Sequence, residues 1–192
     1  GFVAGIDEAG RGPWAGPVVA AAVILNPRAI PSGINDSKKL NPAKREALFE
    51  QLMAHACCSV GMASVEEIDT HNILGATKLA MQRALLMLPT TPTVALVDGN
   101  RAPELPCKTI TVIGGDAKSL SIAAASIIAK VTRDRHMREL AQEYPGYGWE
   151  KNAGYGTALH QECLAKLGVT PHHRKSFAPI RALLEAIETV AA

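Results

Sequence analysis

Two adjacent carboxylates, Asp7 and Glu8, follow a short apolar run near the start of the chain. A longer apolar run comes soon after, at residues 18–25, and such runs bounded by glycine and proline are typical of buried strands. Two carboxylates at the end of a buried strand repel each other and lose solvation unless a cation lies between them. Because hard divalent ions such as Mg²⁺ prefer oxygen ligands, the pair predicts a metal site.

The segment after this pair, Gly10-Arg11-Gly12, suits contact with phosphate, because glycine leaves the backbone N–H groups uncovered. On a regular strand, Asp7 and Glu8 would point to opposite faces of the sheet. If both serve one site, we expect the backbone to turn or bulge here, which the glycines permit. An exposed turn in which Glu8 pairs with Arg11 is an equally good interpretation of these residues alone.

Two further acids follow later apolar runs that read as strands. Asp98 comes directly after residues 93–97, and Asp116 follows residues 108–113. Ligand sites in α/β sheets gather at the carboxyl ends of parallel strands, so these acids meet the first pair if the strands are neighbours. Four converging carboxylates suit two-metal phosphoryl transfer, in which ions about 3.5–4 Å apart activate a water and stabilise the leaving oxygen.

Asp134 could be assigned to the same cluster, but its neighbours suggest a simpler role. Lys130 and Arg138 lie four residues before and after it on a predicted helix. Residues at this spacing face each other, so we expect Asp134 to form a surface ion pair and not to be a fifth ligand.

The pattern of strands and helices predicts a mixed sheet, antiparallel first and parallel later, with helices on both faces. Asn41 and Pro42 form a typical helix start, and Ser64 begins a capping box. Nothing in the sequence suggests a linker, so we predict one domain over 1–192, with a helical C-terminal extension at about 145–192. Strands are expected near residues 2–7, 18–25, 57–63, 93–97 and 108–113, and helices near 42–55, 64–71, 72–88, 121–143, 157–168 and 177–190. On the first of these helices the buried face should hold Leu48, Phe49, Leu52 and Met53.

Composition excludes several classes of protein. The chain has 192 residues, a formal net charge of only +2 and a pI near 8.4, so a polyanion site must come from local clusters of basic residues. Residues 28–45 and 171–181 are such clusters, although a run of charge is more often a solvated face. No apolar run reaches the ~18 residues needed to span a bilayer, and no signal peptide begins the chain. The 4 cysteines lack metal-binding spacing, which favours reduced, buried thiols and a cytoplasmic location.

A series of short motifs follows in order between residue 2 and about residue 181. They are IDEAGRGP at 6–13, DSKKL at 36–40, VDG at 97–99, GD at 115–116, AASIIAKVTRD at 124–134, GYG at 154–156 and HRKSF at 173–177. Together they resemble the type 2 ribonuclease H family, and within it most closely the bacterial ribonuclease HII group. The resemblance implies a ribonuclease H-like five-stranded mixed sheet with helices on both faces and a helical C-terminal extension.

The resemblance also implies an activity and a metal site. The expected reaction is hydrolysis of the RNA strand of RNA–DNA hybrids, and cleavage 5′ of single ribonucleotides embedded in duplex DNA, leaving a 3′-hydroxyl and a 5′-phosphate. A role in ribonucleotide excision repair would follow from it. The family's catalytic, metal-binding acids fall on Asp7, Glu8, Asp98 and Asp116, and two Mn²⁺ or Mg²⁺ ions are expected with substrate.

Substrate contacts are implied in the same way. The family's contacts to the backbone around the ribonucleotide fall on the glycine-arginine-glycine segment, and its junction-sensing tyrosine falls on Tyr155, which could otherwise be a half-buried loop aromatic. Ser37 and Lys38 suit phosphate, although Asp36-Ser37 could merely shape the loop. His172 and His173 are expected on a basic, substrate-facing surface and not as metal ligands. The predicted substrate-binding residues are Gly10, Arg11, Gly12, Ser37, Lys38, Tyr155 and Arg174.

The expected partners are RNA–DNA hybrids and ribonucleotide-containing duplex DNA; we expect no membrane contact, and a monomer. Two other functions are considered and are less well supported. A nuclease of the integrase or resolvase type would act on DNA only, and the glycine-arginine-glycine segment argues against it. A non-catalytic binding module would have lost at least one of the four acids, and all four are present. The sequence does not indicate whether a protein such as a replication clamp binds.

Overall fold

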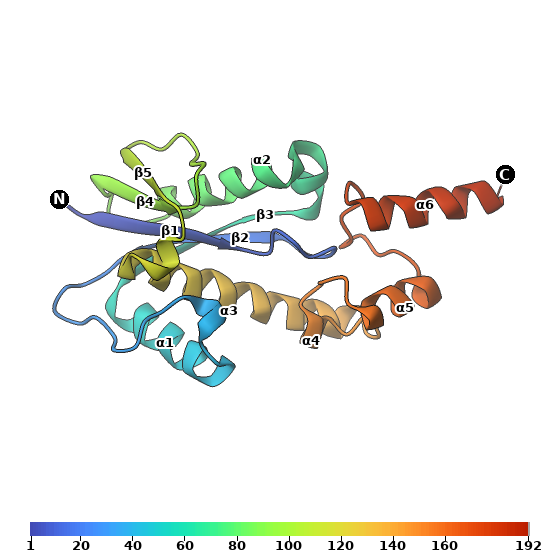
Figure 1. The fold of residues 1–192 in the computed structure, drawn as a ribbon, viewed down its shortest axis with the longest axis horizontal. Helices are drawn as coiled ribbons and strands as arrows, with labels where there is room; N and C mark the ends of the chain where they lie inside the picture. Colours follow the sequence, from blue (N-terminus) through green and yellow to red (C-terminus); the bar gives the residue numbers. More distant parts are fainter. Residues whose placement is uncertain (192) are drawn as a thin grey trace.

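A five-stranded mixed sheet forms the centre of the computed structural model, which describes residues 1–191 and side chains through residue 189 (Figure 1). The strand order is β3-β2-β1-β4-β5. β1 pairs antiparallel with β2, and β2 with β3, whereas β1 pairs parallel with β4, and β4 with β5. The predicted antiparallel start and parallel end are therefore confirmed. The strands are β1 (Val3–Ala9), β2 (Val18–Ile24), β3 (Cys57–Ala63), β4 (Val94–Asp98) and β5 (Lys108–Val112).

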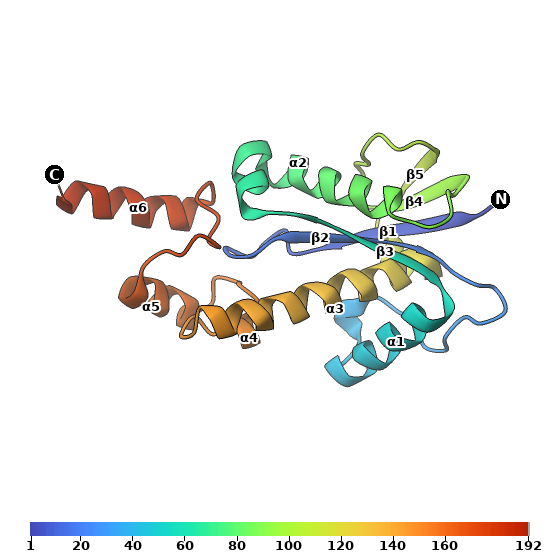
Figure 2. The ribbon, with the colours of Figure 1, turned by 180° about the vertical axis from the view of Figure 1, so that it is seen from behind.

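Helices cover both faces of the sheet. α1 (Pro42–His55) and α3 (Leu120–Glu143) lie on one face, and α2 (Val65–Leu86) lies on the other (Figures 1 and 2). One apolar core fills the space between the sheet and α2, and a second lies between the sheet, α1 and α3. All seven residues of β2 are buried, because a strand covered on both faces has no solvent side.

Local signals placed several helix boundaries correctly. The Asn41 side chain accepts the Lys44 N–H at the start of α1, and Ser64 and Glu67 form the predicted capping box. The expected break before residues 72–88 is a kink inside α2 at Asn72, where φ is 58°. One detail is wrong: Met53 is 50% exposed, whereas the other three predicted residues of the buried α1 face are buried.

The position of β1 is set by its close contact with α3. A Cβ atom at Gly5 would collide with the backbone of Ser121, in the first turn of α3. Only glycine permits this approach, and it brings the helix directly onto the strand that carries Asp7. The close contact between the backbones of β1 and α3 therefore fixes the position of Asp7.

The C-terminal part packs around the far end of α3. It contains α4 (Trp149–Asn152), α5 (Ala158–Leu167) and α6 (Ala178–Ala191), which lie beyond the ends of the strands (Figure 1). Met137, Leu140 and Trp149 belong to a third apolar cluster there. The predicted loop before Gly154 is interrupted by α4, which the sequence did not reveal because it has only four residues between two left-handed ones.

Two observations bear on the expected location of the chain. Among the helices that the structure describes, none has the length and apolar composition needed to cross a membrane. All 4 cysteines carry free thiols, as expected, but each is partly buried where buried thiols were predicted.

Candidate active site

The parallel strands bring the predicted acids to one edge of the sheet. Ile6 of β1 pairs with Val97 of β4, so Asp7 lies beside Asp98, where β4 ends. β5 ends next to β4, and the short 3₁₀ helix η2 (Gly115–Ala117) then carries Asp116 to the same edge. Residues distant in the chain therefore gather as the sheet topology predicted.

The expected bulge at Asp7 and Glu8 is absent. Both residues pair regularly with β2, and β1 continues to Ala9 before the chain turns at Gly10, where φ is 95°. The carboxylates can still share one region because β1 extends beyond the last paired residue of β4. A regular strand can therefore place Asp7, which is buried, and Glu8, which lines the groove, near the end of β4.

Mutual repulsion and burial dominate the electrostatics of this cluster. Asp7 is 6% exposed, and its pKa is raised well above the ordinary value by burial first and then by Glu8, Asp98 and Asp116. Burial, Asp36 and Asp98 also raise the pKa of Asp116. The pKa of Glu8 is raised by burial, against the opposing effect of Arg11. The cluster is thus short of positive charge.

Three of the four carboxylates have a neighbour that orients them. The Glu8 Oε1 atom lies 3.3 Å from a guanidinium nitrogen of Arg11, so the pairing considered as an alternative does form. Asp98 Oδ1 accepts the Gly115 N–H at 2.6 Å, which ties η2 to the end of β4. Asp7 Oδ1 accepts the Glu8 N–H at 2.7 Å.

The donor set of this cluster fits hard divalent ions. In residues 1–191 no three His, Cys, Asp or Glu side chains stand close enough to form a finished coordination shell. The four acids nevertheless supply only carboxylate oxygens, the ligands that Mg²⁺ and Mn²⁺ prefer. Added positive charge would also relieve the repulsion that raises the pKa of Asp7.

We expect Asp7 to make stability depend on pH when divalent ions are removed. Between the unfolded-state pKa of about 3.9 and the raised folded-state pKa, the folded chain binds more protons than the unfolded chain. The free energy of unfolding should therefore fall as the pH rises through this interval. Urea unfolding in EDTA should show this fall in the wild type and a smaller one in Asp7→Asn; identical profiles would contradict the raised pKa.

Two buried arginines donate hydrogen bonds to the loop that follows β1. Arg174 is 0% exposed, and its guanidinium donates to the carbonyl oxygens of Gly10 at 2.6 Å, Arg11 at 3.0 Å and Gly16 at 2.9 Å. Arg133, on α3, donates to Pro17, Ala153 and Ala15 at 2.9, 2.9 and 3.0 Å. The two arginines thus position the Gly10–Gly12 backbone at the site.

Two predictions about the C-terminal basic cluster are therefore wrong. Arg174 cannot touch substrate, because it is enclosed and its donors are used by loop carbonyls. His173 is also fully buried and is not on a substrate-facing surface. Burial lowers the pKa of Arg174 to about 9, which still leaves the guanidinium charged at neutral pH.

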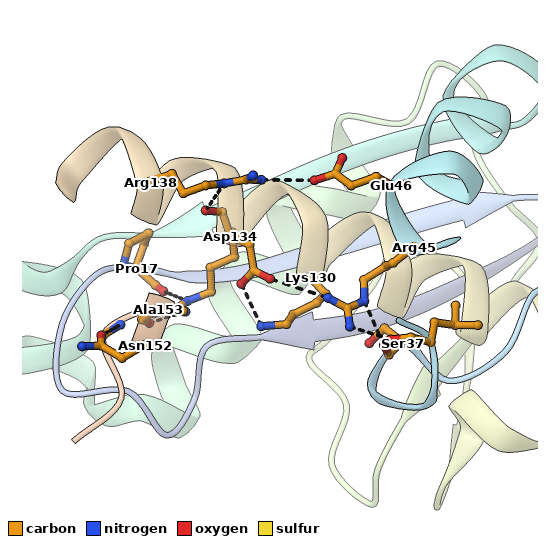
Figure 3. A network of polar contacts seen from close by, with 12 residues as sticks. Pro17, Ser37, Arg45, Glu46, Lys130, Asp134, Arg138, Asn152 and Ala153 are labelled. Atoms are coloured by element: carbon orange, nitrogen blue, oxygen red, sulfur yellow. Dashed lines mark hydrogen bonds and ion pairs between the residues drawn. The ribbon is translucent and has the colours of Figure 1, made fainter. Parts of the chain in front are cut away.

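A polar network beside the site shapes the loop that carries Ser37 and Lys38. Arg45 donates to the carbonyl oxygens of Ser37 and Leu40, each at 2.9 Å (Figure 3). The Asp36 side chain caps the 3₁₀ helix η1 (Ser37–Lys39) by accepting the Lys38 N–H. Asp36 therefore does shape the loop, while Lys38 remains exposed and Ser37 is buried.

Asp134 belongs to this network and not to the carboxylate cluster. Its Oδ1 atom lies 2.7 Å from Lys130 Nζ, and its Oδ2 atom lies 3.8 Å from Arg45 (Figure 3). The predicted pairing with Lys130 is confirmed. Arg138 differs from the prediction, because it donates to the Asp134 backbone carbonyl and pairs with Glu46.

A groove of about 670 Å³ runs along this edge of the molecule. Tyr155, 47% exposed, stands at it beside Gly12, where an added Cβ would lie 3.3 Å from the tyrosine ring. Of the predicted substrate-binding residues, only Arg174 is not part of the groove lining. The lining includes Glu8, Gly10, Arg11, Gly12, Ser37, Lys38, Asp98, Lys130 and Tyr155.

No local pattern in the sequence indicates the role of Arg133. In a helical stretch with basic and acidic neighbours it resembles an ordinary surface charge, yet it is 1% exposed. The only available signal was its place inside the motif at residues 124–134, which does not distinguish a buried side chain from an exposed one.

Comparison with known proteins agrees with the geometry. The family model described as Ribonuclease HII matches residues 4–180. A protein of Jannaschia sp. named Ribonuclease HII is 60% identical over 185 residues, which are 96% of this chain and 93% of that protein. The crystal structure of ribonuclease H2 from Pyrococcus horikoshii has a TM-score of 0.81 at 29% identity, covering 98% of this chain and 99% of that one.

A more distant structure shares the fold. It is Bst-RNase HIII in complex with Mn²⁺, with a TM-score of 0.74 at 20% identity, covering 98% of this chain and 70% of that one. The five-stranded mixed sheet with helices on both faces thus agrees with structures of this group. The chain belongs to the ribonuclease HII family, whose members are endonucleases that cut the RNA of RNA–DNA hybrids.

Proposed function

We propose that this chain also cleaves duplex DNA at single embedded ribonucleotides. The phosphodiester bond on the 5′ side of the ribonucleotide is hydrolysed, leaving a 3′-hydroxyl and a 5′-phosphate. The observation that supports the proposal is that acidic, basic and aromatic side chains line one groove. The carboxylates of Glu8 and Asp98 line it together with Lys38 and Tyr155. A phosphodiester that enters the groove therefore meets acids, a cation and an aromatic ring together.

In this proposal Asp7, Glu8, Asp98 and Asp116 are the catalytic acids and hold two Mg²⁺ or Mn²⁺ ions. Such ions, when bound, supply activation of a water and stabilisation of the leaving oxygen. The repulsion that raises the pKa of Asp7 supports this assignment, because the cluster favours cations. The Mn²⁺ complex of the distant Bst-RNase HIII is consistent with it.

Recognition of ribose requires contact with the 2′-hydroxyl group, which is what distinguishes RNA from DNA. We assign this contact to the backbone of Gly10–Gly12, which Arg174 holds in place from the buried side. We assign phosphate binding to Arg11, Ser37 and Lys38. The exposed ring of Tyr155 would stack on the sugar or base next to the ribonucleotide.

The proposal is tested with matched duplexes that carry zero, one or four ribonucleotides, each assayed with Mg²⁺ and with chelator. We expect cleavage of the second and third duplexes only, on the 5′ side of ribose, and none with chelator. Cleavage of the ribose-free duplex would favour the DNA-only nuclease, and an intact single-ribonucleotide duplex would overturn the proposal.

Tyr155→Ala should reduce cleavage at a single embedded ribonucleotide more than cleavage of a long hybrid. Stacking of a base on an aromatic ring contributes about 1–3 kcal/mol, so kcat/KM for the first substrate should fall roughly ten- to a hundredfold. Tyr155→Phe keeps the ring and serves as the control, with little change expected. Equal losses on both substrates would contradict a role for Tyr155 at the junction.

A further inference from the structure

Two fully buried histidines join the segment that carries Tyr155 to the segment that carries Arg174. His160 lies in α5, and His173 lies just before α6; both are 0% exposed. Their Nε2 atoms are 3.1 Å apart. Neither ring has a carboxylate hydrogen-bond partner; both are satisfied by backbone groups, Trp149, Thr170 and each other.

The hydrogen-bond partners define the protonation of both rings. His160 Nδ1 lies 2.9 Å from the Tyr155 carbonyl oxygen, which can only accept, so Nδ1 carries the proton. His160 Nε2 therefore accepts, and it receives the Trp149 indole N–H at 3.2 Å. The proton between the two histidines must then come from His173 Nε2.

The other nitrogen of His173 completes the chain of hydrogen bonds. Its Nδ1 atom accepts the Thr170 N–H at 2.9 Å and lies 2.9 Å from the Thr170 hydroxyl. Every ring nitrogen thus has a partner of the correct kind, with both imidazoles neutral. Burial and the neighbouring His160 lower the pKa of His173 to about 4, which is consistent with this state.

One end of this chain of hydrogen bonds, Tyr155, lines the substrate groove, and the segment at the other end pairs with the loop that follows β1. Residues 172–174 pair with the strand-like segment after Gly12: Gly16 N donates to the His172 carbonyl, and Arg174 N donates to the Trp14 carbonyl, each at 2.8 Å. Trp14 N in turn donates to the Gly154 carbonyl at 2.8 Å. Tyr155 is therefore linked to the Gly10–Gly12 loop through Trp14 on one side and through the histidines on the other.

We propose that His160 and His173 are positioning residues that hold Tyr155 beside Gly12 and thereby set the preference for an embedded ribonucleotide. The inference rests on the proposed function of Tyr155. An apolar pair could fill the same volume among Tyr147 and Trp149. It could not give the Tyr155 carbonyl, which also accepts the Thr157 N–H, its second donor, and it could not accept the Thr170 N–H.

Two amide substitutions at His160 separate the bond to Tyr155 from the bond to His173. In His160→Asn the amide nitrogen takes the place of Nδ1 and can still donate to the Tyr155 carbonyl. In His160→Gln the amide oxygen takes the place of Nε2, so the bonds from Trp149 and His173 remain and the bond to Tyr155 is lost. Both variants are neutral, and His55→Gln, at an exposed position at the end of α1, is the matched control.

The measurement is the ratio of kcat/KM for the single-ribonucleotide duplex to that for the long hybrid. We expect this ratio to fall about three- to tenfold in His160→Gln, the range that one net hydrogen bond accounts for. It should stay within about twofold of the wild type in His55→Gln, and it should fall less in His160→Asn, which keeps the bond to Tyr155 but loses the bond from His173. A purely structural role would lower kcat/KM for both substrates equally and leave their ratio unchanged. That result would overturn the inference.

His173 provides an independent route if His160→Gln fails to fold in a urea titration. His173→Gln keeps the donor toward His160 and should preserve the ratio, whereas His173→Asn removes the bond to His160 and should lower the ratio as His160→Asn does. Equal ratios in these two variants would overturn the inference.

A double-mutant cycle separates this inference from the proposed function. Adding His160→Gln to Tyr155→Ala should change the ratio no further. If Tyr155→Ala lowers the ratio and His160→Gln does not, the inference fails alone. If Tyr155→Ala leaves the ratio unchanged, the recognition role of Tyr155 fails, and the inference fails with it.

Discussion

Asp7→Asn is expected to lower cleavage of every substrate at least about a thousandfold, which corresponds to about 4 kcal/mol of transition-state stabilisation. Asp7 is the most buried of the four acids and the one whose pKa is affected by the other three. Asparagine keeps the shape and the acceptor oxygen but removes the charge that attracts cations. Single-turnover cleavage of a labelled duplex measures the loss.

Binding of substrate should survive the same change. The groove residues Lys38 and Tyr155 are untouched, so the Kd for duplex should stay within about threefold of the wild type at fixed salt. Glu162→Gln, at an exposed position in α5 away from the groove, is the matched control and should retain activity within about twofold. Full turnover by Asp7→Asn, or loss of activity in both variants, would contradict the assignment of the metal site.

Arg174→Ala is expected to destabilise the chain by about 3–5 kcal/mol, the cost of breaking a buried charged network. The substitution leaves the carbonyl oxygens of Gly10, Arg11 and Gly16 without their Arg174 donor and opens a cavity beneath the loop. Urea unfolding measures the effect. Lys175→Ala, at the exposed neighbouring position, is the control and should change stability by less than about 0.5 kcal/mol.

This experiment also decides between two roles for the arginine. A substrate contact at the surface would weaken duplex binding without changing the unfolding midpoint. The buried hydrogen bonds instead predict that Arg174→Ala lowers the free energy of unfolding, and that activity falls because the protein is destabilised. An Arg174→Ala variant of wild-type stability would contradict the structure.

Local signals in the sequence predicted most of the sheet and the gathering of acids. Asn41-Pro42 and the Ser64 capping box act within one turn of helix, so four or five residues suffice to recognise them. Asp98 and Asp116 follow strands whose parallel order brings their ends together, and alternating strands and helices indicated that order. These features depend on neighbours in the sequence.

The features that sequence reasoning missed depend on distant contacts. Arg133 and Arg174 look like surface charges until residues 10–17 fold over them, and no local pattern records that burial. The regular course of β1 at Asp7 and Glu8 follows from pairing with β2 and from β4 ending sooner. The hydrogen bond between His160 and His173 joins segments whose approach only the packing around Trp149 reveals.

The central claim is that Asp7, Glu8, Asp98 and Asp116 jointly bind divalent cations. Its most direct test is to titrate Mn²⁺ into substrate-free protein and to measure the midpoint of thermal unfolding at each concentration. A ligand at a hundred times its Kd stabilises the folded state by about 2.7 kcal/mol, so the wild-type midpoint should rise by several degrees. In Asp98→Asn the rise should be largely lost. An equal rise in both proteins would show that the ions bind elsewhere and would contradict the account.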